Sequence, residues 1–311
     1  MNTKRVSFIL PAFKRQFFAK AIASILAQTV SDFDLIIVDD ASPEKLAEVV
    51  NQFNDPRIRY YRNDRNIGGT NLISNWNLAL SYAQSEFCVL ASDDDIYHPE
   101  YLERMLFLAA RYPSVNLFHC RILMIDGDDT PIGISPCRPE YERCLDFVFD
   151  RAVNRVLQVA PEFFFRREPL VAQGGFVDFP LAWYSDDATW MMLARKNGVA
   201  YCSETLFYWR YSGINISARF DKTAHKIQAA EQYKKWLFDF LDELAQEGPT
   251  EKILLRICKE RAEISVDKQS LFDLDDTHLW PWLKLLFTGK VKNNRLFLRS
   301  IQRRVKKICG L

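Results

Sequence analysis

The sequence lacks several features that would place it at a membrane or outside the cell. No apolar run reaches 18 residues, which excludes a conventional membrane-spanning helix. The seven cysteines form no C-x-x-C pair and lie mostly within apolar runs, as reduced, buried thiols of a cytosolic protein do. The first residues enter a strand with no long apolar segment behind them, so we expect no signal peptide. These absences predict a cytoplasmic protein whose membrane contact, if any, is peripheral.

Several catalytic motifs are missing as well. No G-x-G-x-x-G follows the first predicted strand and no G-x-x-x-x-G-K-[ST] occurs, which disfavours a nicotinamide dehydrogenase and a P-loop phosphotransferase. A serine hydrolase of the G-x-S-x-G type is disfavoured for the same reason. The four histidines lack the spacing of zinc ligands. With a net charge of +1, the composition gives no indication of a nucleic-acid partner.

What is present is a regular alternation of strand and helix patterns over residues 6–112. The 311 residues are 48% hydrophobic, enough for one large domain or two unequal ones. Apolar runs predict strands over residues 6–10, 35–38, 58–61 and 87–90, and helical spacing predicts helices over residues 17–28, 71–83 and 101–112. We expect Pro11 to close the first strand, Ser42 and Pro43 to start a helix, and Pro99 to start another. Continuous apolar strands separated by helices predict a parallel sheet covered on both faces.

Acidic residues follow two of these strands. Asp39 and Asp40 end the strand over residues 35–38, and Asp93, Asp94 and Asp95 follow the strand over residues 87–90. Ligands of such sheets bind at the carboxyl ends of the strands, so one crevice could gather both groups with residues 11–15. Clustered carboxylates repel each other unless a cation lies between them, and oxygen ligands favour Mg²⁺ or Mn²⁺. The alternative is a set of solvated loop residues that stabilise helix N-termini.

The second half of the chain is less regular. Residues 115–209 mix strand and helix patterns, and Ser185, Asp186 and Asp187 open a predicted helix that runs through Ala194. As structure, Ser185 would cap this helix and the aspartates would lie in its positive first turn. As chemistry, a carboxylate there could serve as a general base, and both interpretations remain open. From about residue 220 the pattern is helical, with Gly248-Pro249 between two segments.

The C-terminal tail is strongly basic. The last 35 residues carry nine lysines and arginines and no acidic residue, so the rest of the chain is net acidic. Tryptophans and aliphatic residues over 279–287, and basic and apolar residues interleaved over 296–308, are typical of a helix at an anionic membrane surface. A helix packed on the rest of the protein, with a solvated basic face, is the alternative. No recognition module accompanies the tail, so we expect no nucleic-acid binding.

The N-terminal motifs together resemble family 2 glycosyltransferases. The resemblance rests on VSFILPAFKR (6–15), SILAQT (24–29), IIVDDAS (36–42), DPRI (55–58), NIG (66–68) and SDDD (92–95), in this order and spacing. Further on, GGF (174–176), SDD (185–187), WRYS (209–212) and NIS (215–217) resemble the acceptor half of the family. Together these motifs cover about two thirds of the chain.

The resemblance implies a GT-A fold, in which a Rossmann-like, mostly parallel α/β sheet is flanked by helices and followed here by a helical C-terminal extension. It implies a glycosyltransferase domain over residues 1–218, with a nucleotide-binding half (1–112) and an acceptor half (113–218), and a helical region over residues 219–311. It also implies inverting transfer from a nucleotide-sugar donor, a UDP-sugar by expectation, to a glycan or lipid-linked acceptor in surface polysaccharide synthesis. We expect the protein to act in the cytoplasm, on the inner face of the cell membrane.

The family roles carry over to matched positions of this sequence. Asp187 would be the catalytic base, and Asp94, with Asp95, would hold Mn²⁺ or Mg²⁺. The expected donor-binding residues are Pro11, Ala12, Phe13, Arg15, Asp39, Asn66 and Asp93. Asp186, Arg210 and Ser212 would lie near the reacting groups, Ser212 at a position that is often histidine in the family.

This chain also departs from the family pattern. Phe13 and Lys14 replace the usual Tyr-Asn pair and add a cation near the expected phosphates, while Ala91 stands where many members carry the first acid of Asp-x-Asp. The metal site therefore rests on the triplet at 93–95. Two other functions use the same layout: a sugar nucleotidyltransferase, which would release pyrophosphate, and a non-catalytic sugar- or partner-binding protein.

Overall fold

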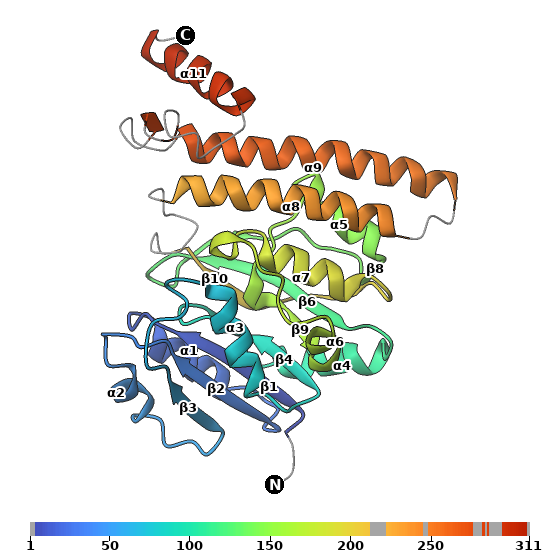
Figure 1. Ribbon diagram of the computed structural model, residues 1–311. Helices are drawn as coiled ribbons and strands as arrows, with labels where there is room; N and C mark the ends of the chain where they lie inside the picture. Colours follow the sequence, from blue (N-terminus) through green and yellow to red (C-terminus); the bar gives the residue numbers. More distant parts are fainter. Residues whose placement is uncertain are drawn as a thin grey trace. The chain divides into compact units, whose positions relative to one another are not determined.

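The computed structural model describes residues 4–211, 222–244, 248–275, 282, 283, 285 and 294–309, with the side chains of the last helix described over residues 295–304. The chain divides into two compact units, whose elements are labelled in Figure 1. Unit 1 comprises Met1–Phe147, Val156–Val177 and Asp186–Ser212, and unit 2 comprises Val148–Arg155, Asp178–Ser185 and Gly213–Leu311. The domain boundary that the sequence places after residue 218 lies outside the described residues.

Unit 1 is built on one sheet, and its first four strands are parallel (Figure 1). They are β1 (Val6–Ala12), β2 (Phe33–Asp39), β3 (Ile58–Arg62) and β4 (Phe87–Leu90), in the order β3-β2-β1-β4. Each of these strands had been predicted from an apolar run. Because neighbouring parallel strands end at the same edge, the residues that follow β1, β2 and β4 lie close together.

The rest of the sheet is mixed. It consists of β5 (Ile96–Tyr97), β6 (Leu117–Ile125), β7 (Pro131–Ile134), β8 (Tyr141–Glu142), β9 (Phe164–Arg166) and β10 (Val199–Arg210). β9 pairs antiparallel with both β4 and β6, whereas β10 runs parallel to β6 and antiparallel to β5 and β8. The predicted α/β class is confirmed, with uniform parallel pairing confined to the first four strands.

Helices cover both faces of the parallel strands, which explains why those strands read as continuous apolar runs. Val6, Phe8 and Leu10 of β1 point into a core shared with α1 (Phe18–Leu26), α2 (Leu46–Val50) and α4 (Tyr101–Arg111). The alternate residues of β1 face the other side, where α3 (Leu72–Ser81) packs against β1 and β2. A strand buried on both sides cannot alternate apolar and polar residues.

Three predicted boundaries are wrong for identifiable reasons. Pro11 lies inside β1 and does not close it, because β4 pairs with β1 only as far as Ile9 and needs no N–H from residue 11. The second helix begins at Leu46, not at Pro43, since Lys45 adopts a left-handed conformation and the Ser42 hydroxyl donates to a carbonyl of the first loop. Pro99 precedes the next helix and does not open it, because the short strand β5, which the sequence did not predict, comes between; the start of α4 at Tyr101 agrees with the predicted helical spacing.

Shorter elements complete the central part of the chain. They are α5 (Cys144–Ala152), the 3₁₀ turn η1 (Ala160–Glu162), α6 (Arg167–Ala172), the turn η2 (Pro180–Ala182) and α7 (Ser185–Ala194). The start of α7 at Ser185 agrees with the prediction and puts both aspartates of the SDD motif in its first turn. Their carboxylates therefore meet the positive end of the helix dipole.

Unit 2 is helical. Its long helices are α8 (Thr223–Glu243) and α9 (Pro249–Asp275), separated at Gly248-Pro249 as predicted, and the basic tail forms α11 (Asn294–Cys309). α8 and α9 pack along each other (Figure 1). Leu296 and Phe297 of α11 join a small core with Trp282 and Leu274. Within the described part of the chain, no helix is both long enough and apolar enough to cross a membrane.

Candidate active site

The loop after β1 is held by the acidic triplet after β4. The backbone N–H groups of Phe13 and Lys14 both donate to Oδ2 of Asp93, at 2.8 and 2.7 Å. Two charge-assisted hydrogen bonds to one buried oxygen fix the loop against the end of β4. Residues 11–15 and Asp93, predicted to share a crevice, therefore do lie together.

Lys14 is the cation of this cluster. Its ammonium lies 3.3 Å from Oδ1 of Asp93 and forms a short ion pair with Oδ2 of Asp94. Burial opposes the charged form, but the charges of Asp93 and Asp94 outweigh it and raise the pKa of Lys14. The side chain thus stays protonated and neutralises the two carboxylates.

Asp95 and Arg210 form the wall behind this pair. The Arg210 backbone N–H donates to Oδ1 of Asp95 at 2.8 Å, and its Nε donates to the Asp94 carbonyl at 2.8 Å. The other Asp95 oxygen accepts the Ser92 hydroxyl. Burial, followed by the charge of Asp94, raises the pKa of Asp95 above its ordinary value. The fully buried Arg210 side chain also reaches Oδ1 of Asp129 at 2.6 Å, so both residues serve the shape of the site.

These contacts test how a divalent metal would fit. Among the described residues no three His, Cys, Asp or Glu side chains are grouped as metal ligands. Within the same residues, Lys14 is the only partner of the Asp94 carboxylate, whereas Asp93 and Asp95 each accept hydrogen bonds at both oxygens or from the backbone. Mg²⁺ and Mn²⁺ are commonly held by one or two carboxylates plus substrate phosphates. Asp94 would fit as one such carboxylate ligand.

The carboxylate of Asp39, after β2, has more hydrogen-bond partners among the described residues than that of Asp94. Asp39 is fully buried; its Oδ1 accepts the Ser42 N–H at 2.8 Å, and its Oδ2 accepts the Tyr60 hydroxyl at 2.5 Å and the Arg62 guanidinium. Burial and the bond to Asp39 raise the pKa of Tyr60 to about 12, so the phenol remains a donor. The predicted contact between Asp39 and a nucleotide base would therefore require Tyr60 or Arg62 to move.

Asp40 fixes the turn that carries Asn66. Its carboxylate accepts the N–H groups of Ile67 and Gly68 at 2.8 and 2.7 Å. A Cβ at position 68 would lie 2.9 Å from the Asp40 carboxylate, which explains the glycine there. Asn66 itself is exposed and accepts the Gly69 N–H. Its predicted contact with the donor stays a prediction.

The remaining first-loop residues differ in exposure. Pro11 and Ala12 end β1, and the Phe13 side chain is 39% exposed. Arg15 is exposed and its guanidinium binds Glu48 at 3.2 Å. Phe13 and Arg15 are thus accessible to a ligand, whereas Ala12 can offer only its backbone.

Asp187 lies in the first turn of α7 and is buried. Oδ1 of Asp187 accepts a hydrogen bond from Nε2 of Gln158 at 3.0 Å. The segment that carries Gln158 is tied in turn to β5, because the Tyr97 hydroxyl donates to the Pro161 carbonyl at 2.7 Å. Hydrogen bonds thus connect the helix of Asp187 to the strand that follows Asp95. Asp186 is half-buried beside it, and Ser212 lies outside the described residues.

Sequence reasoning missed Gln158 and a buried pair next to it. Glu162 is buried with its Oε1 3.2 Å from Nδ1 of His119. Burial raises the pKa of Glu162 well above its ordinary value and lowers that of His119 well below. Both shifts favour the neutral forms, so this is a hydrogen-bonded pair without charge. No local motif marks these residues; only the strand order brings them together.

The comparisons with known proteins show to which family the chain belongs. The family model described as glycosyl transferase family 2 matches residues 7–167, slightly more than half of the chain. The chain belongs to glycosyl transferase family 2. This match includes the loop after β1, both acidic strand ends and Gln158, whereas Asp187 lies beyond it.

Individual proteins of known name are also similar to this family 2 member. WcaA of Escherichia coli (strain K12), assigned to colanic acid biosynthesis, is 40% identical over 118 residues, which are 37% of this chain and 40% of WcaA. The UDP-Glc:alpha-D-GlcNAc-diphosphoundecaprenol beta-1,3-glucosyltransferase WfgD of E. coli is 31% identical over 164 residues, 49% of this chain and 63% of WfgD. Each of these matches therefore spans less than two thirds of the relative's length.

Solved structures confirm the fold. TarS of S. aureus in complex with UDP-GlcNAc has a TM-score of 0.66 and 16% identity, covering 88% of this chain and 80% of that chain. The mannosyltransferase PcManGT of Pyrobaculum calidifontis, in complex with GDP-Man and Mn²⁺, has a TM-score of 0.57 and 17% identity, covering 99% and 88%. At these identities the likeness supports the fold alone, and the predicted GT-A fold is confirmed.

Proposed function

We propose that this family 2 protein transfers a sugar from a nucleoside-diphosphate donor, a UDP-sugar, to a hydroxyl group of a glycan or lipid-linked acceptor in surface polysaccharide synthesis. One observation carries the proposal. The loop after β1 and the acids after β4 form a single hydrogen-bonded structure through Asp93, and its Asp94 faces a cation. Relatives named for transfer to undecaprenol-linked sugars, and a neighbour that binds UDP-GlcNAc, support this choice of donor and acceptor.

The residues have separate tasks in this reaction. The first loop, with exposed Phe13 and Arg15, would bind the nucleotide, and Asp94 would hold a divalent metal, Mn²⁺ or Mg²⁺. When bound, that metal supplies a Lewis acid that stabilises charge on the leaving diphosphate. Asp187, oriented by Gln158, would take the proton from the acceptor hydroxyl as it attacks the sugar carbon. One displacement with one base inverts the anomeric configuration.

The base assignment is tested by Asp187→Asn. We expect transfer to fall by about 10²- to 10⁴-fold, the range for loss of general base catalysis. Binding of UDP with Mn²⁺, measured by calorimetry, should change less than about twofold. Asp186→Asn removes a carboxylate from the same helical turn and serves as the matched control, with a much smaller loss. If Asp187→Asn lost UDP binding and transfer together, the residue would be structural.

We further propose that α11 contacts an anionic membrane surface. Leu296 and Phe297 are packed inside unit 2, but Leu298 and Ile301 are exposed beside Arg299 and Arg303. An exposed apolar pair flanked by cations is the composition of an interfacial helix. The full chain should float with vesicles of anionic lipid, whereas a chain that lacks residues 278–311 should not. Equal flotation of both chains would mean that α11 packs on the protein and does not bind the membrane.

A further inference from the structure

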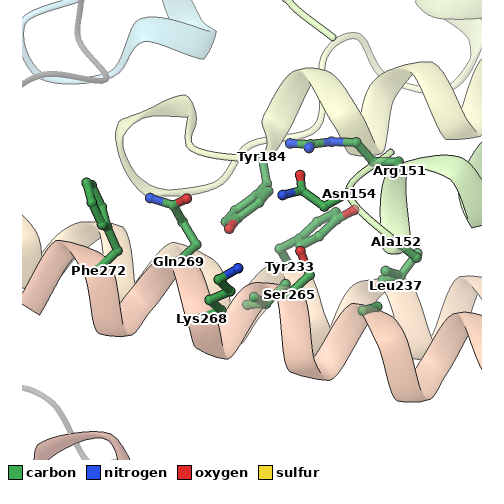
Figure 2. Close-up of a pocket in the computed structure, with 12 residues that line it drawn as sticks. Arg151, Ala152, Asn154, Tyr184, Tyr233, Leu237, Ser265, Lys268, Gln269 and Phe272 are labelled. Carbon is green, nitrogen blue, oxygen red and sulfur yellow. The ribbon is translucent and has the colours of Figure 1, made fainter. Parts of the chain in front are cut away.

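Unit 2 contains a pocket that the proposed chemistry does not use. It has a volume of about 180 Å³, well above the roughly 10–15 Å³ that one water molecule requires. Its walls come from Arg151, Ala152 and Asn154, from Tyr184 and from the facing sides of α8 and α9 (Figure 2). We call it the Tyr184 pocket.

Part of the lining is polar and cationic, beside apolar residues of α8 and α9. Arg151 and Lys268 both line the pocket, and none of its twelve lining residues is acidic. Lys268 is exposed, and in the part of the chain that the structure describes its ammonium forms no ion pair. Asn154 and Gln269 add amide groups that can donate and accept. This set of groups suits a ligand that carries a negative charge and several hydroxyls.

The aromatic residues add a flat apolar wall. The rings of Tyr184 and Tyr233 are stacked, with centroids 4.5 Å apart and an angle of 5° between the planes. Figure 2 shows Tyr184 next to Gln269 and above Lys268, so ring and polar groups come together. Ligand sites commonly combine an aromatic surface with a few placed polar groups. A sugar ring presents both an apolar face and hydroxyl groups.

Backbone strain marks the same residues. Asn154 and Tyr184 have φ values of +55° and +67°, in the left-handed region. That region is unusual for a residue other than glycine, above all for a bulky one. Such strain gathers at ligand sites and switch regions. Two residues with left-handed backbone thus line the same pocket. This observation is independent of the charge of the lining side chains.

The sequence connects this pocket to the predicted base. Tyr184 directly precedes α7 and stands three residues before Asp187. The segment before α7 is also fixed, because the Phe179 N–H donates to the Ser185 hydroxyl at 3.0 Å.

We propose that the Tyr184 pocket binds an anionic saccharide, and that this is the charged part of the acceptor. The second clause rests on the proposed transferase function; the first does not. The shared chemistry is a sugar ring with one negative group, which a uronic acid or a sugar phosphate could supply. Lys268 would pair with the negative group and the Tyr184 ring would cover the sugar.

The test is direct binding to the full chain, without donor or metal. Glucuronate and glucose 1-phosphate are titrated by calorimetry, with glucose and inorganic phosphate beside them. We expect at least one anionic sugar to bind about tenfold or more tightly than glucose and than phosphate, and the tighter of the two identifies the source of the charge. Equal binding of glucose, or of phosphate alone, would overturn the proposal.

Variants assign the binding to this pocket. Lys268→Met should weaken the bound anionic sugar by about tenfold, the effect of losing one partly screened charge pair. Lys268→Arg should retain most of the affinity. Lys252→Met removes an exposed lysine from the same helix, away from the pocket, and should change nothing. If Lys268→Met and Lys252→Met behaved alike, the pocket would not be the site.

The experiments distinguish a failure of the pocket proposal from a failure of the transferase proposal. Loss of UDP binding or of transfer in the unmodified chain, with sugar binding at the pocket intact, would count against the transferase proposal alone. Normal UDP binding with no anionic sugar bound at millimolar concentration would count against the Tyr184 pocket alone.

Discussion

The two acidic strand ends of unit 1 look alike in sequence but differ in their partners. After β2, the Asp39 carboxylate is fully buried and is bound by Ser42, Tyr60 and Arg62, all from its own turn or the neighbouring strand. After β4, one cation among the described residues binds the Asp94 carboxylate, Lys14, which comes from a different loop. Within the described residues, Asp39 thus has three hydrogen-bond partners and the Asp94 carboxylate has one.

This difference indicates where a ligand can bind at lowest cost. A metal or phosphate that approaches Asp39 has to displace hydrogen bonds from three residues, whereas at Asp94 it has to displace one described partner, Lys14. The strand order alone makes both ends candidates, but the partner set favours the end of β4 for the metal. The end of β2 then serves mainly to hold the first loop, through the bond from the Ser42 hydroxyl to the Phe13 carbonyl.

Paired substitutions give the largest expected contrast. Asp94→Asn should lower transfer by about 10²- to 10³-fold, because the Lewis acid loses its anchor, with little change in stability. Asp39→Asn should instead lower the free energy of unfolding by about 2 kcal/mol, through weakened charged hydrogen bonds to a buried group. Transfer assays with and without chelator measure the effect on activity. Urea unfolding measures the effect on stability. Full turnover of Asp94→Asn in chelator would reverse the assignment.

Much of this contrast was beyond the reach of the sequence. The parallel strands, the positions of both acid groups and the start of α7 follow from apolar runs and helix-start signals, which are local. The partners do not: Arg62 reaches Asp39 because β3 pairs with β2, and Gln158 reaches Asp187 across 29 positions of the chain. Local sequence patterns predict that a carboxylate lies at a strand end. Which residues bind that carboxylate depends on the strand order and on contacts between distant segments.

The Tyr184 pocket is even harder to predict from local sequence patterns. Its cationic groups come from α5 and α9, and its central tyrosine comes from the loop before α7. No motif joins these segments, and the left-handed backbone at Tyr184 has no sequence signal such as glycine. The predicted helix start at Pro43 failed for a related reason, since the Ser42 hydroxyl donates to the Phe13 carbonyl of the first loop.

A smaller effect is expected from the cation at the end of β4. Lys14→Met removes the charge that competes for Asp94, so Mn²⁺ should bind the nucleotide-free protein about ten- to a hundredfold more tightly. Calorimetry or electron paramagnetic resonance measures this without any turnover. Lys4→Met, which breaks an exposed pair with Asp32, is the control and should leave the affinity unchanged. Unchanged Mn²⁺ affinity in Lys14→Met would mean that the two cations do not share the carboxylate.

The smallest effect concerns a third buried acid, Glu162, which has His119 and no cation as its hydrogen-bond partner among the described residues. Because burial raises its pKa in the folded state, the folded protein keeps a proton that the unfolded chain releases above about pH 4.5. Stability contributed by this group is therefore lost as the pH rises, by at most about 1.4 kcal/mol per pH unit.

Glu162→Gln removes that proton exchange, so its stability relative to the unmodified chain should improve as the pH rises from 5 to 8. Urea unfolding at several pH values gives the difference, and Glu168→Gln, an exposed carboxyl nearby, should show no such trend. A flat difference over this range would mean that Glu162 is already ionised in the folded protein at pH 5. Glu162 would then be a buried carboxylate like Asp39, and the distinction between closed and open acids would rest on Lys14 alone.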